Sequence, residues 1–223
     1  MTVLVLALDT SSAAVTAAVL AVSPATIELV AERVTINARG HGELLAPAIH
    51  DALDTAGNVP EDLDAIVVGT GPGPYTGLRV GLVTAAVMSE LLGIPAYGVC
   101  SLDGLALPGS TMLVAADARR REVYWARYEN GRRVAGPEVS YPTDVPPWEG
   151  PHVRGAGARL YLDQLRTLRP DVYLLDGDYP SAWSLALRAK GKILAQAPSD
   201  PLTPLYLRRP DAVAPGAPKA VSQ

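Results

Sequence analysis

Residues 69–81 read Gly69-Thr70-Gly71-Pro72-Gly73-Pro74-Tyr75-Thr76-Gly77-Leu78-Arg79-Val80-Gly81. The glycines at the start of this stretch let a strand end turn sharply, while Pro72 and Pro74 stiffen the path of the chain. A long apolar run over residues 76–92 follows, and Gly93 and Pro95 close it, which predicts a helix. Thr76 is placed to cap the amino end of that helix. The stretch therefore predicts a strand, a tight loop and a long helix in succession.

The predicted helix has two apolar faces. Gly77, Gly81 and Ala85 recur every four residues, a stripe of small side chains that lets another backbone come close. Leu78 and Leu82 lie elsewhere on a helix with very few charges, so more than one face is expected to be covered. Two interpretations remain open. Either the chain's own sheet covers the whole helix, or the sheet covers one face and a partner's helix covers the other.

The segments before the loop indicate a sheet with a second helix beside it. Residues 3–8 and 65–70 are near-continuous apolar runs, typical of strands buried on both faces. Further strands are expected over residues 15–22, 27–36 and 96–100. A helix is expected over residues 42–56, with His41 as a possible cap. Its apolar positions recur at helical spacing: Leu44, Leu45, Ala48, Ile49, Ala52, Leu53 and Ala56.

The pattern restarts near residue 108 in the form of a weak internal duplication. In both halves an apolar strand ends in an acid and the next strand begins six residues later, at Asp9 and Val15 and again at Asp117 and Val123. We therefore expect an N-terminal lobe of residues 1–108, a smaller C-terminal lobe of residues 109–210 and a disordered tail of residues 211–223. In the second lobe the expected elements are strands over residues 113–116, 123–128 and 172–175, helices over 158–168 and 181–189, and a loop over 142–151.

Composition limits the classes of function. With 223 residues, of which 48% are hydrophobic and 19% charged, the chain has the balance of a soluble globular protein. Its net charge of −4 provides no bulk attraction to nucleic acid or to an anionic membrane. The apolar start of the chain is too short for a membrane span, and Cys100 is the single cysteine, which fits a reducing cytoplasm.

Three turns are candidates for phosphate binding, and none matches a standard motif. The glycine–proline loop lacks the lysine of a P-loop, and its prolines remove amides that would point at a phosphate. The turn Asp9, Thr10 and Ser11 remains a weak, degenerate candidate for nucleotide binding. In the second half, Arg119, Arg120 and Arg121 stand where glycines would let a phosphate reach backbone amides, although arginines can grip phosphate by charge.

Five blocks in order resemble the TsaB (YeaZ) family. They are Asp9-Thr10-Ser11, His41 to Pro47, Gly71 to Gly81, Asp117 to Tyr124 and Tyr206-Leu207-Arg208-Arg209-Pro210. The block from Gly71 to Gly81 is highly specific for the family. The resemblance implies the two-lobed actin, sugar-kinase and Hsp70-like fold, which agrees with the duplication. It also implies a complex with a catalytic paralogue, TsaD, and an ATPase, TsaE, which together transfer a threonylcarbamoyl group to the adenosine 3′ of the anticodon in tRNA.

The same resemblance implies that this chain is not the catalyst. The paralogue places a metal-binding histidine pair after the strand that follows the helix, and Ser101 and Leu105 stand in those places here. The three histidines, His41, His50 and His152, include no pair at the spacing of a helical metal clamp. We therefore expect no catalytic residue, metal or cofactor in the isolated chain, and ATP and a metal in the partner subunits.

The sequence finally predicts a partner surface and a set of charge contacts. The surface comprises both predicted helices, through Leu44, Leu45, Ile49, Leu53, Gly77, Leu78, Gly81, Leu82 and Ala85. Arg79 and the run from Arg119 to Arg121 are candidates for contact with the partner or with tRNA phosphate. Without TsaD the same surface can pair two copies of the chain. The alternatives are a metallopeptidase of the glycoprotease type and a small-molecule kinase of the same fold.

Overall fold

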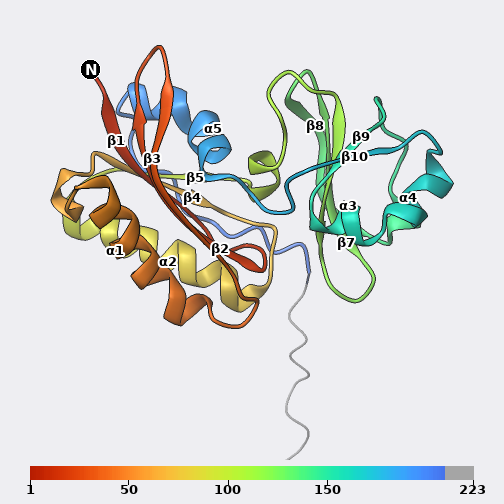
Figure 1. Ribbon diagram of the computed structural model, residues 1–223, viewed down its shortest axis with the longest axis horizontal. Coiled ribbons are helices and arrows are strands. Elements are labelled where there is room, and N and C mark those ends of the chain that lie inside the picture. Colours follow the sequence, from red (N-terminus) through yellow and green to blue (C-terminus); the bar gives the residue numbers. More distant parts are fainter. Residues whose placement is uncertain (209–223) are drawn as a thin grey trace, which may run out of the picture.

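The first sheet is built around β1 (Val3–Asp9), whose apolar run is buried on both faces. A computed structural model describes residues 1–208, and β1 is the central strand of a five-stranded sheet in the order β3-β2-β1-β4-β5 (Figure 1). β2 (Ala14–Val22) and β3 (Ile27–Ile36) run antiparallel, whereas β4 (Ala65–Gly69) and β5 (Ala96–Val99) run parallel to β1. The strands predicted in this half are confirmed to within a residue at each end.

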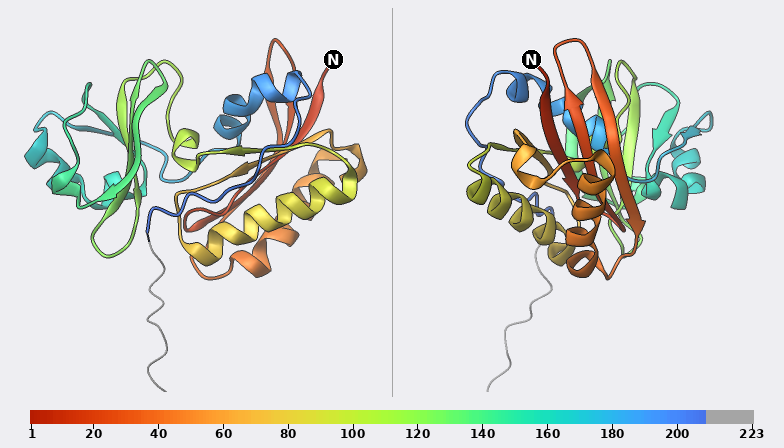
Figure 2. Two further views of the ribbon diagram at one scale, coloured as in Figure 1. Left: turned by 180° about the vertical axis from the view of Figure 1, so that it is seen from behind. Right: turned by 60° about the vertical axis from the view of Figure 1, so that its left-hand side comes forward.

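Three helices cover this sheet on its two faces. α1 (His41–Ala56) and α2 (Tyr75–Leu92) pack on one face, and α5 (Ala182–Leu194) packs on the other. Figure 2 shows α1 and α2 side by side beneath the strands. A short 3-10 helix, η1 (Pro60–Asp62), leads from α1 to β4, and a second one, η2 (Ser101–Gly104), follows β5.

The second sheet repeats the topology of the first. Its strands lie in the order β10-β9-β6-β7-β8. The three strands that come first along the chain are β6 (Met112–Asp117), β7 (Val123–Glu129) and β8 (Arg132–Ser140). They are antiparallel neighbours, like β1, β2 and β3. β9 (His152–Arg154) and β10 (Tyr173–Leu175) then add in parallel, like β4 and β5. This matching order confirms the duplication indicated by the sequence.

Short helices complete the second half. The predicted helix over residues 158–168 is two helices, α3 (Ala156–Leu160) and α4 (Leu162–Leu168), which break at Tyr161. Both pack on one face of the second sheet. The predicted loop over residues 142–151 contains a 3-10 turn, η3 (Pro142–Asp144).

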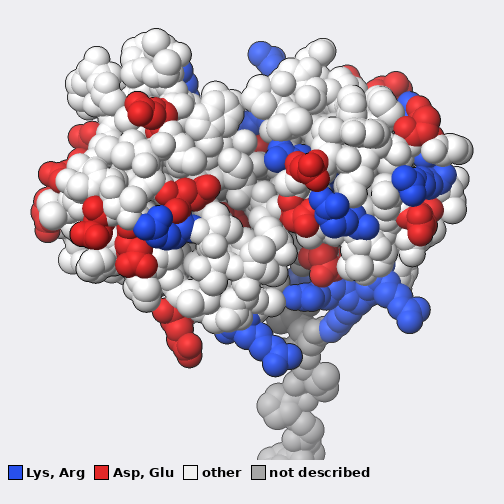
Figure 3. Space-filling view, viewed as in Figure 1, with Lys and Arg blue, Asp and Glu red and all other residues white. Residues whose placement is uncertain are grey.

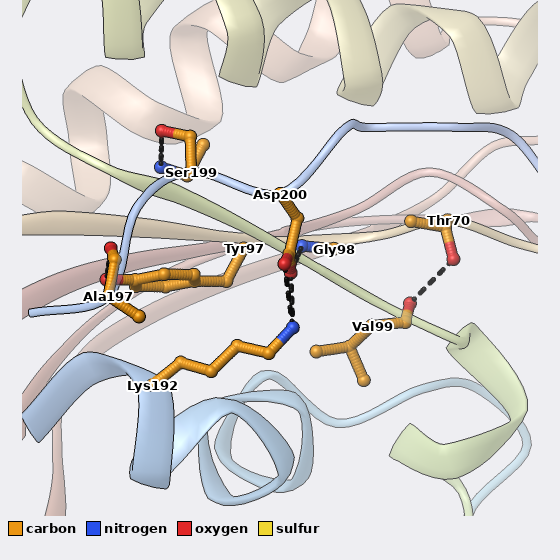
Figure 4. A network of polar contacts seen from close by, with 9 residues as sticks. Thr70, Tyr97, Gly98, Val99, Lys192, Ala197, Ser199 and Asp200 are labelled. Carbon is orange, nitrogen blue, oxygen red and sulfur yellow. Dashed lines mark hydrogen bonds and ion pairs between the residues drawn. The ribbon is translucent and has the colours of Figure 1, made fainter. Parts of the chain in front are cut away.

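The predicted lobe of residues 109–210 is not confined to the second sheet. α5 returns to the first sheet because its apolar residues, among them Leu185 and Ile193, fill the face opposite α1 and α2. The chain after α5 then follows the free edge of β5. There Asp200 bonds both the carbonyl of Ala96 and the amide of Gly98, and the Lys192 ammonium lies 2.7 Å from its carboxylate (Figure 4).

The same C-terminal segment also reaches the second half. Leu202 packs in the core beneath the first sheet, while Leu205 and Leu207 pack between η2 and the second sheet. The segment therefore connects the two halves of the fold. Arg209, Pro210 and the predicted disordered tail of residues 211–223 lie outside the described residues.

Two predicted helix caps are wrong. α2 begins one residue early, with Pro74 at the capping position, and the Thr76 side chain is exposed. α1 has Gly40 at its capping position, and His41 is the first residue of the helix. The His41 ring is buried, and its Nε2 lies 2.8 Å from the carbonyl oxygen of Ser12. This contact fixes α1 to the turn after β1.

Candidate functional site

The glycine–proline loop packs directly on the turn that follows β1. A side chain at Gly69 would collide with the Asp9 carboxylate, and one at Gly73 would collide with the carbonyl of Ser11. The glycines predicted to allow a sharp turn therefore also permit a close approach of two chain segments. This approach places the ends of β1 and β4 and the start of α2 around one small region.

Asp9 is the buried acid of that region. Its carboxylate accepts hydrogen bonds from the amide and hydroxyl of Ser11, at 3.0 and 2.7 Å, and from the hydroxyl of Ser101, at 2.6 Å. The Ser101 hydroxyl in turn accepts a 3.0 Å bond from the Gly71 amide. Burial raises the pKa of the Asp9 carboxyl, and the hydrogen bonds from Ser101 and Ser11 oppose that rise.

Thr10 holds the amino-terminal half of α2. Its hydroxyl donates to the carbonyl of Gly77 at 2.8 Å and accepts from the amide of Gly81 at 3.0 Å. An undistorted helix would pair these two backbone groups with each other, because they are four residues apart. A methyl group at Gly81 would lie 2.5 Å from this hydroxyl oxygen, so the small residues of α2 serve an approach from within the chain.

The predicted nucleotide turn is therefore engaged within the chain. Asp9, Thr10 and Ser11 are all buried, and the polar groups of the first two are bonded to α2, to η2 or within the turn itself. Binding of a nucleotide by this turn stays a prediction, and these contacts argue against it.

A cleft opens beside this turn, between the two sheets. It encloses about 180 Å³, less than the roughly 300 Å³ or more of most sites for small organic ligands. Its lining includes Ser12, Pro72, Ser101, Asp117 and Arg119. Among residues 1–208 no group of three or more His, Cys, Asp or Glu side chains is arranged to hold a metal ion.

Ser101 and Leu105, which stand where the catalytic paralogue is expected to have its histidine pair, are both buried. Ser101 is bonded to Asp9, as described above, and Leu105 is fully buried in the core between η2 and the second sheet. Near them, burial raises the pKa of the Cys100 thiol to about 11. The thiol is therefore protonated near neutral pH and is a poor nucleophile.

The predicted partner-contact residues lie mostly inside the protein. Of the nine, Leu44 is partly buried. The other eight are buried: Leu45, Ile49, Leu53, Gly77, Leu78, Gly81, Leu82 and Ala85. Their burial argues against direct contact with a partner, and such contact stays a prediction. Helical spacing identified an apolar face correctly, but the chain's own sheet and first turn cover that face.

The outward face of α2 is apolar as well. Val83, Val87 and Leu91 recur every four residues and are 59%, 51% and 79% exposed. Exposed Ala86 lies among them, and Glu90 adds one charge to this face. We call Val83, Ala86, Val87 and Leu91 the outer stripe of α2. Sequence reasoning indicated that a second face of this helix would be covered, and the exposed apolar face of α2 consists of residues that were not among the predicted partner contacts.

The surface of α1 beside the stripe is more polar. Its exposed positions include Ala46, Pro47, His50, Asp51 and Asp54. A shallow groove of about 360 Å³ runs between this helix and η1, with Ile49 and Val59 among its lining residues. Of the two helices, α2 therefore carries the exposed apolar face.

The arginines predicted as charge contacts come from two separate places in the chain. Arg119, Arg120 and Arg121 form an exposed turn between β6 and β7. Arg79, near the amino end of α2, lies 4.0 Å from the centre of the Tyr75 ring and donates to the Tyr206 hydroxyl at 3.0 Å. Whether these arginines meet a partner or RNA stays a prediction at this point.

Comparison with known proteins places this geometry in one class. Residues 29–157, more than half of the chain, match the family model described as TsaD: tRNA N6-adenosine threonylcarbamoyltransferase. A YeaZ-like structure from Pseudomonas aeruginosa superposes with a TM-score of 0.73 at 28% identity, over 92% of this chain and all of that one. The chain thus has the fold of the TsaD class of proteins.

Individual relatives narrow the assignment. An uncharacterised protein of Mycobacterium tuberculosis is 47% identical over 93% of both chains. The Bacillus subtilis tRNA threonylcarbamoyladenosine biosynthesis protein TsaB is 37% identical over 57% of this chain and 56% of its own length. Against a 46% identical relative from Mycobacterium leprae, the chain spans 56% of that protein's length. The chain belongs to the TsaB (YeaZ) family.

Proposed function

We propose that this chain is a non-catalytic subunit of the complex that forms N6-threonylcarbamoyladenosine in tRNA. The observation that carries the proposal is the outer stripe of α2, an apolar face on a helix whose other side is already packed on the sheet. Contiguous exposed apolar surface of this kind is typical of protein-binding sites. The B. subtilis relative is named as a threonylcarbamoyladenosine biosynthesis protein, which supplies the pathway.

The partner we propose is TsaD, with the ATPase TsaE joining the complex. The family resemblance implies both, together with the actin, sugar-kinase and Hsp70-like fold that the repeated sheet topology supports. In the absence of TsaD, two copies of the chain would pair through the same stripe. The complex that we propose modifies tRNA in the cytoplasm.

The region around Asp9 supports a non-catalytic role. A metal centre needs ligands with free lone pairs, but the Asp9 carboxylate accepts three hydrogen bonds, and Leu105 has no donor atom. These contacts give no support to a metallopeptidase, and the small cleft gives none to a kinase. We propose that ATP and the metal ion are held by the partner subunits.

Reconstitution with and without this chain tests the proposal. TsaD, TsaE, threonylcarbamoyl adenylate and unmodified tRNA should yield modified adenosine only when the chain is present. The chain alone should yield none. Modified adenosine formed by the chain without TsaD, or a stoichiometric transition metal in the purified chain, would contradict the proposal.

A further inference from the structure

Positive charge gathers at one edge of a protein that is acidic overall. The net charge of the chain is −4. Figure 3 nevertheless shows lysine and arginine side chains collected along the lower edge of the molecule, near the point where the described chain ends. Contacts along the chain link five arginines from three separate segments: Arg79, Arg119, Arg120, Arg121 and Arg208. We call these five the arginine edge.

The central part of the edge is a backbone turn in an unfavourable conformation. Arg119, Arg120 and Arg121 have φ angles of 60°, 53° and 64°, three consecutive left-handed residues. Each costs about 1–2 kcal/mol for a residue with a side chain. The Asp117 carboxylate accepts a 2.8 Å bond from the Arg119 amide, and the Glu122 amide donates to the Arg119 carbonyl at 2.9 Å. These two hydrogen bonds hold the turn, on which the three adjacent arginines are exposed.

The C-terminal segment joins this turn to the amino end of α2. The Arg208 guanidinium donates to the Arg119 carbonyl at 3.4 Å and forms an ion pair with Glu122. Two residues earlier, the Tyr206 ring lies against the Tyr75 ring with centroids 5.0 Å apart. Tyr206 and Tyr75 are 37% and 44% exposed, so both rings remain accessible from solvent.

Charge and ring chemistry together identify the kind of partner. Among residues 1–208, Arg119 forms an ion pair with Asp117 and Arg208 forms one with Glu122. Arginine binds phosphate oxygens in a two-pronged geometry. Exposed tyrosines beside a guanidinium offer a stacking surface for unpaired bases. An acidic protein would use the charge but not the rings.

We propose that the arginine edge, with Tyr75 and Tyr206, binds the RNA backbone directly. The proposal rests on the proposed function, because it names the contact that this subunit itself makes with tRNA. The φ angles support it, since a strained turn is kept where the surrounding structure holds side chains in a required direction. RNA binding by the complex should then depend on this chain's own charges.

The test compares two triple variants that remove the same charge. Arg119→Asn, Arg120→Asn and Arg121→Asn are combined in one protein, because asparagine tolerates left-handed backbone. The control combines Arg132→Asn, Arg166→Asn and Lys190→Asn; Arg132 lies beyond the opposite end of β7, Arg166 is on α4, and Lys190 is on α5 beside Pro24. Assembly with TsaD is measured first without RNA, and then the affinity of each complex for an unmodified tRNA transcript is measured at several salt concentrations.

We expect the arginine triple variant to bind tRNA at least about tenfold more weakly at low salt than the control. The slope of log affinity against log salt should flatten by about 2–3, because each lost phosphate contact removes about 0.7–0.9. Tyr206→Ala should weaken binding about threefold or more with little change in slope. If the triple variant is unfolded, the three single variants are compared, and each should flatten the slope by about one.

Equal tRNA affinity and equal salt slopes for the two triple variants would overturn the proposal. So would loss of assembly with TsaD by the arginine triple variant but not by the control, since the edge would then bind an acidic protein partner. If the wild-type chain does not assemble with TsaD at all, the proposed function fails, and the same variants are compared for tRNA binding by the chain alone. The two failures are therefore distinguishable.

Discussion

Replacing Val87 with aspartate places a charge in the middle of the outer stripe of α2. The Val87 side chain is 51% exposed, so about half of its area is available for burial by a partner. Full burial of a valine is worth roughly 2 kcal/mol, so about 1 kcal/mol is lost with the side chain. An unpaired carboxylate in an apolar interface costs about 3 kcal/mol more. The combined loss of about 4 kcal/mol corresponds to roughly a thousandfold weaker binding of TsaD.

Val134 provides a matched control for this change. It lies on β8 of the second sheet and is 50% exposed, so Val134→Asp introduces the same charge at the same exposure. The free energy of unfolding of both variants should stay close to that of the wild type and shift by similar amounts, because both side chains are half exposed in the free chain. Binding to TsaD by isothermal titration calorimetry and assembly by gel filtration are the measurements. Val87→Asp that binds like wild type, or Val134→Asp that binds equally poorly, would refute the assignment of the stripe.

Three further predictions concern packing and hydrogen bonds within the chain. Gly81→Ala should destabilise the chain by about 1–3 kcal/mol, because the new methyl group meets the Thr10 hydroxyl at 2.5 Å. In a Thr10→Ala background the same change should cost less than about 0.5 kcal/mol, and additive losses in thermal unfolding would count against this contact. Ser101→Ala should cost about 1–3 kcal/mol near neutral pH, since the Asp9 carboxylate loses a donor. The loss of stability should shrink as the pH falls, because a protonated Asp9 does not need the donor. Burial raises the pKa of Asp9, so the difference in unfolding free energy between variant and wild type should appear as the pH rises through that folded-state pKa. A difference that does not depend on pH in urea titrations would exclude this explanation. Asp200→Ala should lower the free energy of unfolding by about 1–2 kcal/mol, because the Gly98 amide loses its hydrogen-bond acceptor. Lys192→Ala should lower it by less than about 1 kcal/mol, because the Lys192 ammonium belongs to a half-exposed ion pair. Equal losses for the two variants would contradict this difference.

Local patterns predicted most of the first sheet because its strands are long and buried. β1 and β4 are apolar throughout, and the period of residues 42–56 locates α1. The second sheet gave weaker signals. β8 carries Gly136 and Pro137 and shows no regular alternation of burial, and β9 and β10 have three residues each. Segments of that length carry too little periodicity to be distinguished from loops.

The site was harder to predict than the fold because its decisive contacts are distant in sequence. Thr10 and Gly81 are separated by 71 residues, and Ser101 and Asp9 by 92. The spacing of Gly77 and Gly81 showed that something comes close to α2, but spacing does not identify what approaches. The burial of Leu82 and the exposure of Val83 likewise follow from the position of the sheet, since both are apolar neighbours on one helix.

The turn after β1 connects the buried network to the proposed partner surface. Thr10 bonds two backbone groups of α2, His41 fixes α1 to Ser12, and Ser101 bonds Asp9 across from the loop that precedes α2. Each contact uses a polar group that a nucleotide or metal site would need free. Because these groups are bonded within the chain instead, they hold both helices on the sheet and present the outer stripe in one orientation. A fixed helix loses less conformational freedom on binding than a mobile one, so these contacts would favour the association that we propose for the outer stripe.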